Sequence, residues 1–199
     1  MEILDRIVGE LKDAFKYCKT RTKNKYYGDR FEEWVVKSSN ISKNGFWDSH
    51  NSKAYWKLLE WRGDKYIDGY RPLSSSAPDL LMECISDKKR QVGEIIAVEC
   101  KWRSTLHNFY LEKEDVCKYE GYVRNNKSKD SIKCLFYVFG FGWSDNNPKM
   151  VYVIPADKLY DYNKDTCAIS FHAKGSAADI AAQFDDYKWE ANYLMYWYK

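Results

Sequence analysis

The sequence predicts an α/β protein in which helices flank one central mixed β-sheet. Two observations predict this class. Three successive segments between residues 55 and 102 have the composition of strands, and a helical segment follows them before two more strongly apolar strands. With 199 residues, 45% of them hydrophobic, the chain can bury one sizeable core, so we expect a single domain over residues 1–199.

The first expected element is a basic amphipathic helix over residues 1–25. Apolar residues recur there at spacings of three and four: Ile3, Leu4, Ile7, Val8, Leu11 and Phe15. The end of this segment and the residues after it are basic, with Lys12, Lys16, Lys19, Arg21, Lys23, Lys25 and Arg30. Such a cluster either contacts phosphates or forms a solvated face.

A second helix is expected to open at Gly28, because Phe31, Trp34, Val35 and Ser38 share one helical face that Glu32 borders. The polar residues 41–53 then predict a loop. The strands that follow are expected from about residue 55 to Trp61, over 78–86 and over 93–102, and the last two are joined by the turn DKKRQV.

The second half of the chain continues the alternation. Residues 103–109 predict a loop, residues 111–126 a helix, and residues 132–143 and 150–155 two strands. Pro155 is expected at the first position of a short helix over 156–162, and Ser176 with Asp179 predicts a capping box that opens a C-terminal helix. The expected order is αβββαβ over about 28–154, with a helical extension over about 155–199.

Three ionisable residues are expected to meet at one end of the predicted hairpin. If its connection turns about Lys89, Leu81 faces Ala97 and Asp79 faces Glu99. Directly opposed residues of an antiparallel pair lie on the same face with Cβ atoms about 5 Å apart. Lys101, two residues beyond Glu99, shares that face, as does Arg103, which could hold a phosphate.

Two adjacent carboxylates repel each other unless a cation lies between them. Carboxylate oxygens, a strand carbonyl and water are ligands that suit Mg²⁺. Such an ion can activate water and neutralise charge on a phosphodiester, with Lys101 beside it as a compact positive charge. The alternative is structural: Asp79 caps a turn, while Glu99 and Lys101 form a surface ion pair.

The motif Pro78-Asp79, a 19-residue spacer and then Glu99-Cys100-Lys101 resembles the PD-(D/E)xK nuclease superfamily, which has the restriction endonuclease-like fold. The resemblance implies that Asp79, Glu99 and the Cys100 carbonyl bind the metal, that Lys101 is catalytic, and that Glu32 completes the site. Some members carry a Q-x-x-x-Y pair on the following helix. The corresponding residues here are Lys118 and Tyr122, so the Gln is replaced, and the resemblance implies that these two residues, with Arg103, contact nucleic acid.

The resemblance implies a Mg²⁺-dependent deoxyribonuclease, an endonuclease that uses metal-activated water, with Mn²⁺ as a substitute. The alternative is a catalytically inactive protein with this fold that binds nucleic acid or acts as a scaffold. The expected partner is DNA, and a homodimer or a protein that guides specificity is compatible with the sequence. The chain has no apolar run that could span a bilayer, and we expect a cytoplasmic protein.

Overall fold

The computed structural model describes residues 23–39, 41–42, 56–61, 77–85, 92–125, 132–144 and 147–189. Most of the predicted N-terminal helix over residues 1–25 lies outside these ranges, and so do Lys12, Lys16, Lys19, Arg21 and the C-terminal residues 190–199. No helix in the described part of the chain is both long enough and apolar enough to cross a membrane.

The described chain is an α/β protein with one mixed sheet and a separate small hairpin. The strands of the sheet are β1 (Ile41–Ser42), β2 (Trp56–Trp61), β3 (Leu80–Cys84), β4 (Ile95–Arg103), β5 (Ile132–Ser144), β6 (Asn147–Pro155) and β9 (Lys188–Trp189), in the spatial order β1-β2-β3-β4-β5-β6-β9. The hairpin consists of β7 (Tyr160–Asn163) and β8 (Ala168–Phe171). Helical segments occupy residues 23–38, α2 (Lys113–Asn125), α3 (Ala156–Leu159), α4 (Ala177–Gln183) and the 3₁₀ turn η1 (Asp185–Tyr187).

The predicted order of helix, three strands, helix and strand is confirmed over the described ranges. Strands β2, β3 and β4 are antiparallel neighbours. Helix α2 then carries the chain back so that β5 lies parallel to β4, and β6 returns antiparallel to β5. The two-residue strand β1 lies parallel to β2 within a segment that we expected to be a loop.

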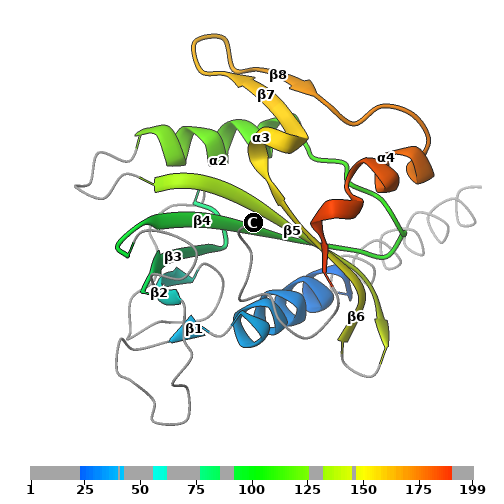
Figure 1. The fold of residues 1–199 in the computed structure, drawn as a ribbon, viewed down its shortest axis with the longest axis horizontal. Coiled ribbons are helices and arrows are strands. Elements are labelled where there is room, and N and C mark those ends of the chain that lie inside the picture. Colours follow the sequence, from blue (N-terminus) through cyan, green and yellow to red (C-terminus); the bar gives the residue numbers. More distant parts are fainter. Residues whose placement is uncertain are drawn as a thin grey trace, which may run out of the picture.

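Helices cover the two faces of the sheet differently. The helix over residues 23–38 lies below the sheet in Figure 1, while α2, α3, α4 and the β7–β8 hairpin lie above it. Below the sheet, Phe31 and Val35 are fully buried against side chains such as Met82 and Val98. The upper core joins α2 to strand side chains and to the ring of Phe109. Alternate residues of β4 therefore face opposite cores.

Gly140 of β5 makes room for Phe31. A Cβ atom at position 140 would lie 2.2 Å from Phe31 Cε2, and Phe31 is fully buried. Because the ring would have to move within a packed core, we expect Gly140→Ala to lower the free energy of unfolding by about 1–3 kcal/mol. For a protein of this size that lowers Tm by roughly 2–12 °C, which thermal denaturation followed by circular dichroism measures.

Gly121→Ala is the matched control for this substitution. Gly121 lies within α2, and the nearest atom to an added Cβ is Asn125 Nδ2 at 4.0 Å. Alanine is the better helix former, so this variant should gain up to about 1 kcal/mol. Equal melting temperatures for the two variants would contradict the close packing of Phe31 on β5.

Two boundaries predicted from the sequence are wrong. The helix does not open at Gly28, because residues 23–27 are already helical and Tyr27 stacks on Trp102 with ring centroids 4.7 Å apart. The short helix expected over 156–162 ends at Leu159, and Pro155 is its N-cap instead of its first residue. Tyr160 begins β7, where its ring is buried. The C-terminal extension is therefore not purely helical.

The capping box predicted at Ser176 is confirmed. The Ser176 side chain accepts a hydrogen bond from the Asp179 amide, and the Asp179 carboxylate accepts one from the Ser176 amide. This box opens α4 at Ala177.

Candidate active site

The register of the β3–β4 hairpin places the candidate residues. Leu81 pairs with Ala97, as predicted, and the ladder ends at the pair Leu80 and Val98. Asp79 immediately precedes β3, and Glu99 is the next residue along β4. The two acids therefore lie at the point where the paired part of the hairpin ends.

The side chains of Asp79 and Glu99 each accept a hydrogen bond from a backbone amide on the opposite side of the hairpin. Oδ2 of Asp79 accepts a hydrogen bond of 2.8 Å from the Cys100 amide, and Oε2 of Glu99 accepts one of 3.2 Å from the Asp79 amide. Asp79 Oδ1 has no hydrogen-bond partner within the part of the chain that the structure describes. One carboxylate oxygen of Asp79 is thus available to a ligand.

The Lys101 side chain also points toward Glu99. Its Nζ lies 2.8 Å from Glu99 Oε1 and 3.6 Å from Asp115 Oδ2, and it lies 5.4 Å from the centroid of the Tyr119 ring. Glu99 is only 3% exposed, which excludes the alternative of a surface ion pair between Glu99 and Lys101. Removing one partner of a buried ion pair leaves a buried charge unpaired, which strongly destabilises the folded state. The contact between Lys101 and Glu99 is therefore held more firmly than a surface ion pair.

Neighbouring carboxylates determine the direction in which the pKa of Lys101 shifts. Burial by itself lowers the pKa of the ammonium, but the carboxylates of Glu99, Asp79 and Asp115 outweigh burial, and the net effect raises the pKa. Lys101 therefore stays protonated at neutral pH. The raised pKa favours the charged ammonium, which can stabilise negative charge.

Helix α2 supplies two residues that the sequence analysis missed. The Tyr119 hydroxyl donates a 2.7 Å hydrogen bond to Glu99 Oε1, and Asp115 lies one turn earlier on the same face, beside Lys101. Burial, followed by the charge of Glu99, raises the pKa of Tyr119, so the hydroxyl keeps its proton and remains a donor. In the sequence, the spacing of four residues between Asp115 and Tyr119 indicates that their side chains share one face of the helix.

The Asp79 carboxyl group lies in an environment that disfavours its ionised form. Burial raises the pKa of its carboxyl well above the ordinary value, and the charges of Glu99 and Glu32 raise it further. The Cys100 amide and Lys101 oppose this shift and do not overcome it. The ionised form of Asp79 is therefore unfavourable in the metal-free protein, and a cation bound beside the carboxylate would stabilise it.

Glu32 reaches the site from the other face of the sheet. It belongs to the helix over residues 23–38, and its Oε2 accepts a 3.3 Å hydrogen bond from Trp61 Nε1. Its charge contributes to the raised pKa of both Asp79 and the Cys100 thiol, where burial is the largest cause. It lies close enough to act on Asp79 through its charge.

The donor set fits a hard divalent cation. Among the described residues, no group of three or more His, Cys, Asp or Glu side chains is placed to hold a metal ion by itself. An ion here would take one oxygen each from Asp79 and Glu99, the Cys100 carbonyl, and water for its other positions. Mg²⁺ commonly keeps several water ligands, whereas Zn²⁺ sites use Cys and His side chains.

The three residues expected to contact nucleic acid have different surroundings. Arg103 donates to the carbonyl oxygens of Trp102 and Tyr110, at 3.1 and 3.0 Å. Lys118 is half-exposed and pairs with Asp115 at 3.2 Å. Tyr122 donates to Glu60 at 3.2 Å. Tyr119 is therefore the tyrosine of α2 that contacts Glu99.

Comparison with protein-family models, curated proteins and solved structures finds no match to this chain. The geometry of the site is therefore the basis for any functional assignment.

Proposed function

We propose that this protein is a Mg²⁺-dependent nuclease of the PD-(D/E)xK type that hydrolyses phosphodiester bonds in DNA. One observation carries the proposal: Asp79 and Glu99 converge at the end of the β3–β4 hairpin, with the Lys101 Nζ 2.8 Å from Glu99. Two acids beside one ammonium are suited to a metal ion and a phosphate.

The fold supports the same proposal. A restriction endonuclease-like core has the order αβββαβ, and the described elements follow this order from the helix over residues 23–38 to β5, with the two-residue strand β1 added before β2. The candidate residues come from β4, from the residue before β3, and from helices on both faces. The parallel pairing of β4 and β5 leaves the carboxyl half of β4 next to α2, where Lys101 meets Asp115.

Each residue has a defined task in this proposal. Asp79 and Glu99 hold the cation with the Cys100 carbonyl, and Tyr119 fixes the orientation of the Glu99 carboxylate through its hydroxyl. Lys101 keeps its positive charge where the phosphate develops negative charge. A bound Mg²⁺ supplies charge neutralisation at the phosphate and makes a water molecule a stronger acid.

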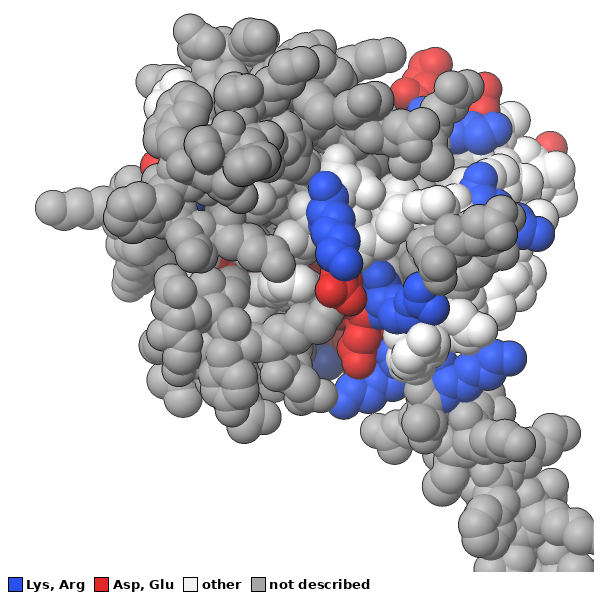
Figure 2. Space-filling model, turned by 90° about the horizontal axis from the view of Figure 1, so that it is seen from below, with Lys and Arg blue, Asp and Glu red and all other residues white. Residues whose placement is uncertain are grey.

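A surface of mixed charge lies on the face below the sheet. Figure 2 shows Lys and Arg side chains around a few Asp and Glu side chains on the face below the sheet, where the helix over residues 23–38 lies. The described basic residues of that helix are Lys23, Lys25, Arg30 and Lys37, and Lys37 pairs with Glu33 at 3.3 Å. This mixed surface is compatible with backbone contacts to DNA and does not require them.

The proposal is tested by incubating the protein with supercoiled, linear and branched DNA. We expect cleavage with Mg²⁺ or Mn²⁺, none with EDTA, and DNA binding without efficient cleavage in Ca²⁺, whose longer and looser coordination activates water poorly. Gel electrophoresis measures products, and fluorescence anisotropy measures binding in parallel. Binding without cleavage under any metal would favour the inactive nucleic-acid-binding protein over the nuclease.

A further inference from the structure

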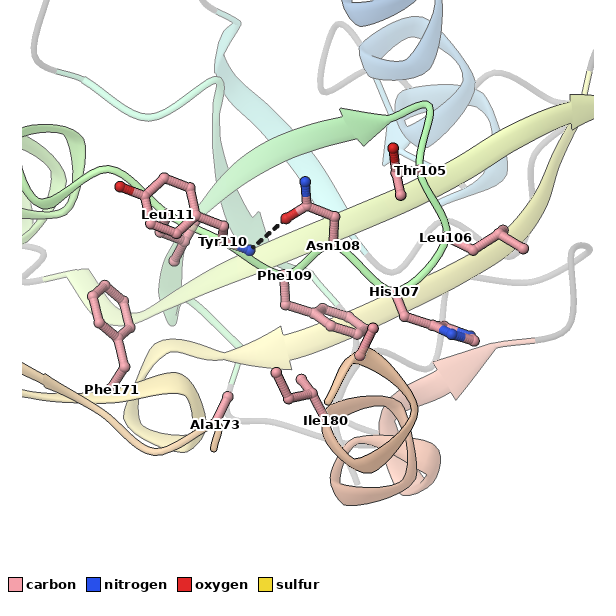
Figure 3. Close-up of a pocket in the computed structure, with 11 residues that line it drawn as sticks. Thr105, Leu106, His107, Asn108, Phe109, Tyr110, Leu111, Phe171, Ala173 and Ile180 are labelled. Carbon is pink, nitrogen blue, oxygen red and sulfur yellow. Dashed lines mark hydrogen bonds between the residues drawn. The ribbon is translucent and has the colours of Figure 1, made fainter. Parts of the chain in front are cut away.

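A hollow of about 490 Å³ lies between the loop over residues 105–111, which follows β4, and the segment that joins β8 to α4. We call it the 105–111 pocket. Its walls are mainly apolar, with Leu106 and Leu111 on the loop side and Phe171 and Ile180 on the other. Figure 3 shows the loop residues facing Phe171, Ala173 and Ile180 across this space. Its size and lining are those of a small-molecule site.

The loop also supplies polar groups. Asn108 Oδ1 accepts a 3.1 Å hydrogen bond from the Tyr110 amide, which leaves the side-chain amide nitrogen of Asn108 as a donor. Thr105 and His107 also line the pocket, and His107 holds a left-handed backbone conformation with φ 59°. Apolar walls with a few donors and acceptors fit a flat ring with a polar edge, such as a nucleobase.

The pocket is connected to the candidate active site through Arg103. The guanidinium of Arg103 donates to the Tyr110 carbonyl, so it ties the loop to the end of β4. Lys101 and Arg103 are two residues apart on β4, so their side chains lie on the same face of the sheet, the one that carries the upper core. Thr105 is four residues beyond Lys101, which limits their separation to about 14 Å of extended chain.

We propose that the 105–111 pocket receives one unstacked nucleobase of the DNA strand bound at Lys101. This inference rests on the proposed nuclease function and adds a substrate class to it. An intact duplex must lose stacking and pairing before a base can enter, whereas single-stranded, branched or frayed DNA has already lost them. The enzyme should therefore cut such DNA in preference to intact duplex.

Ala177→Trp tests the pocket without touching the candidate active site. Ala177 lines the pocket at the start of α4, and its neighbour Ala178, which is exposed and does not line it, gives the control Ala178→Trp. The probe is deoxyadenosine, and the readout is the methyl NMR signals of Leu106, Leu111 and Ile180, with Leu58 of the lower core as reference. The nucleoside should shift the three pocket signals in wild type and in Ala178→Trp, with at least tenfold weaker binding in Ala177→Trp.

Cleavage kinetics on frayed DNA complete the test. Base stacking on protein rings changes affinity by roughly 5- to 150-fold, so Ala177→Trp should raise KM by about tenfold or more while Ala178→Trp keeps the wild-type KM. Unshifted pocket signals together with wild-type cleavage by Ala177→Trp would overturn the pocket and leave the nuclease intact. Pocket signals that respond to indole and not to deoxyadenosine would also overturn it. Nucleoside binding in a protein that cuts no DNA would support the base pocket and reject the nuclease.

Discussion

Asp79→Asn should abolish metal-dependent cleavage and, without metal, should make the protein more stable than wild type at neutral pH. Asn removes one of the two carboxylates proposed to hold the cation, while its side-chain oxygen can still accept the hydrogen bond from the Cys100 amide. It also removes the repulsion between Asp79 and the charges of Glu99 and Glu32. Residues at functional sites often carry such a cost in stability.

The pH dependence has a defined sign. Burial, followed by Glu99 and Glu32, raises the pKa of Asp79 in the folded state above the ordinary value of 3.8. The unfolded chain therefore ionises first, so this group's contribution to stability is fully present below about pH 3.8 and is lost as the pH rises through the raised pKa. Metal-free wild type should lose stability relative to Asp79→Asn over that interval, which paired melting curves measure.

Mg²⁺ should reverse the difference between these two proteins. At 100 times its Kd, an ion that binds only the folded state adds about 2.7 kcal/mol, or roughly 5–11 °C in Tm. Wild type should gain this stability on addition of Mg²⁺, and Asp79→Asn should not. Glu83→Gln is the control, because Glu83 lies on β3 but pairs with Lys57 at 3.6 Å, away from the site. Equal stabilisation of Asp79→Asn by Mg²⁺ would contradict the ligand assignment.

The hairpin was predictable because side chains of a strand alternate. With both faces of β4 buried, a shift of one residue would move Glu99 into the lower core, so the register around Leu81 and Ala97 is strongly determined. The convergence of Asp79 with Glu99 follows from that register. Local composition also predicted the order of helices and strands, since apolar periodicity distinguishes long elements well.

Contacts between distant segments were not predictable in the same way. Tyr119 belongs to the helix predicted over residues 111–126, but only the packing of α2 on the sheet shows that its hydroxyl reaches Glu99. The same holds for Tyr160. Its hydroxyl contacts the Tyr137 hydroxyl at 3.1 Å and donates to Glu120 at 3.0 Å, and both partners are far from it in the sequence. Local propensity cannot encode such long-range partners.

Lys101→Ala should lower the rate of DNA cleavage by about 100-fold or more while metal and DNA binding persist. Removing one preorganised electrostatic contact to a transition state typically costs about 10²–10³ in kcat. The Lys101 Nζ is held between Glu99 and Asp115 over the ring of Tyr119. The proposed metal ligands are oxygens of other residues. Single-turnover cleavage measures the chemical step, and DNA affinity in Ca²⁺ checks binding.

Lys118→Ala separates the role of Lys101 from a general loss of positive charge. Both lysines pair with Asp115, at 3.6 and 3.2 Å, but Lys118 is half-exposed on α2, whereas the Lys101 side chain is 15% exposed and contacts Glu99. Removal of the exposed charge should change the cleavage rate by less than about fivefold, because surface pairs contribute little. A similar loss in both variants would assign the effect to Asp115 or to DNA attraction. Wild-type rates in Lys101→Ala would remove Lys101 from the catalytic site and leave Asp79 and Glu99 to be tested alone.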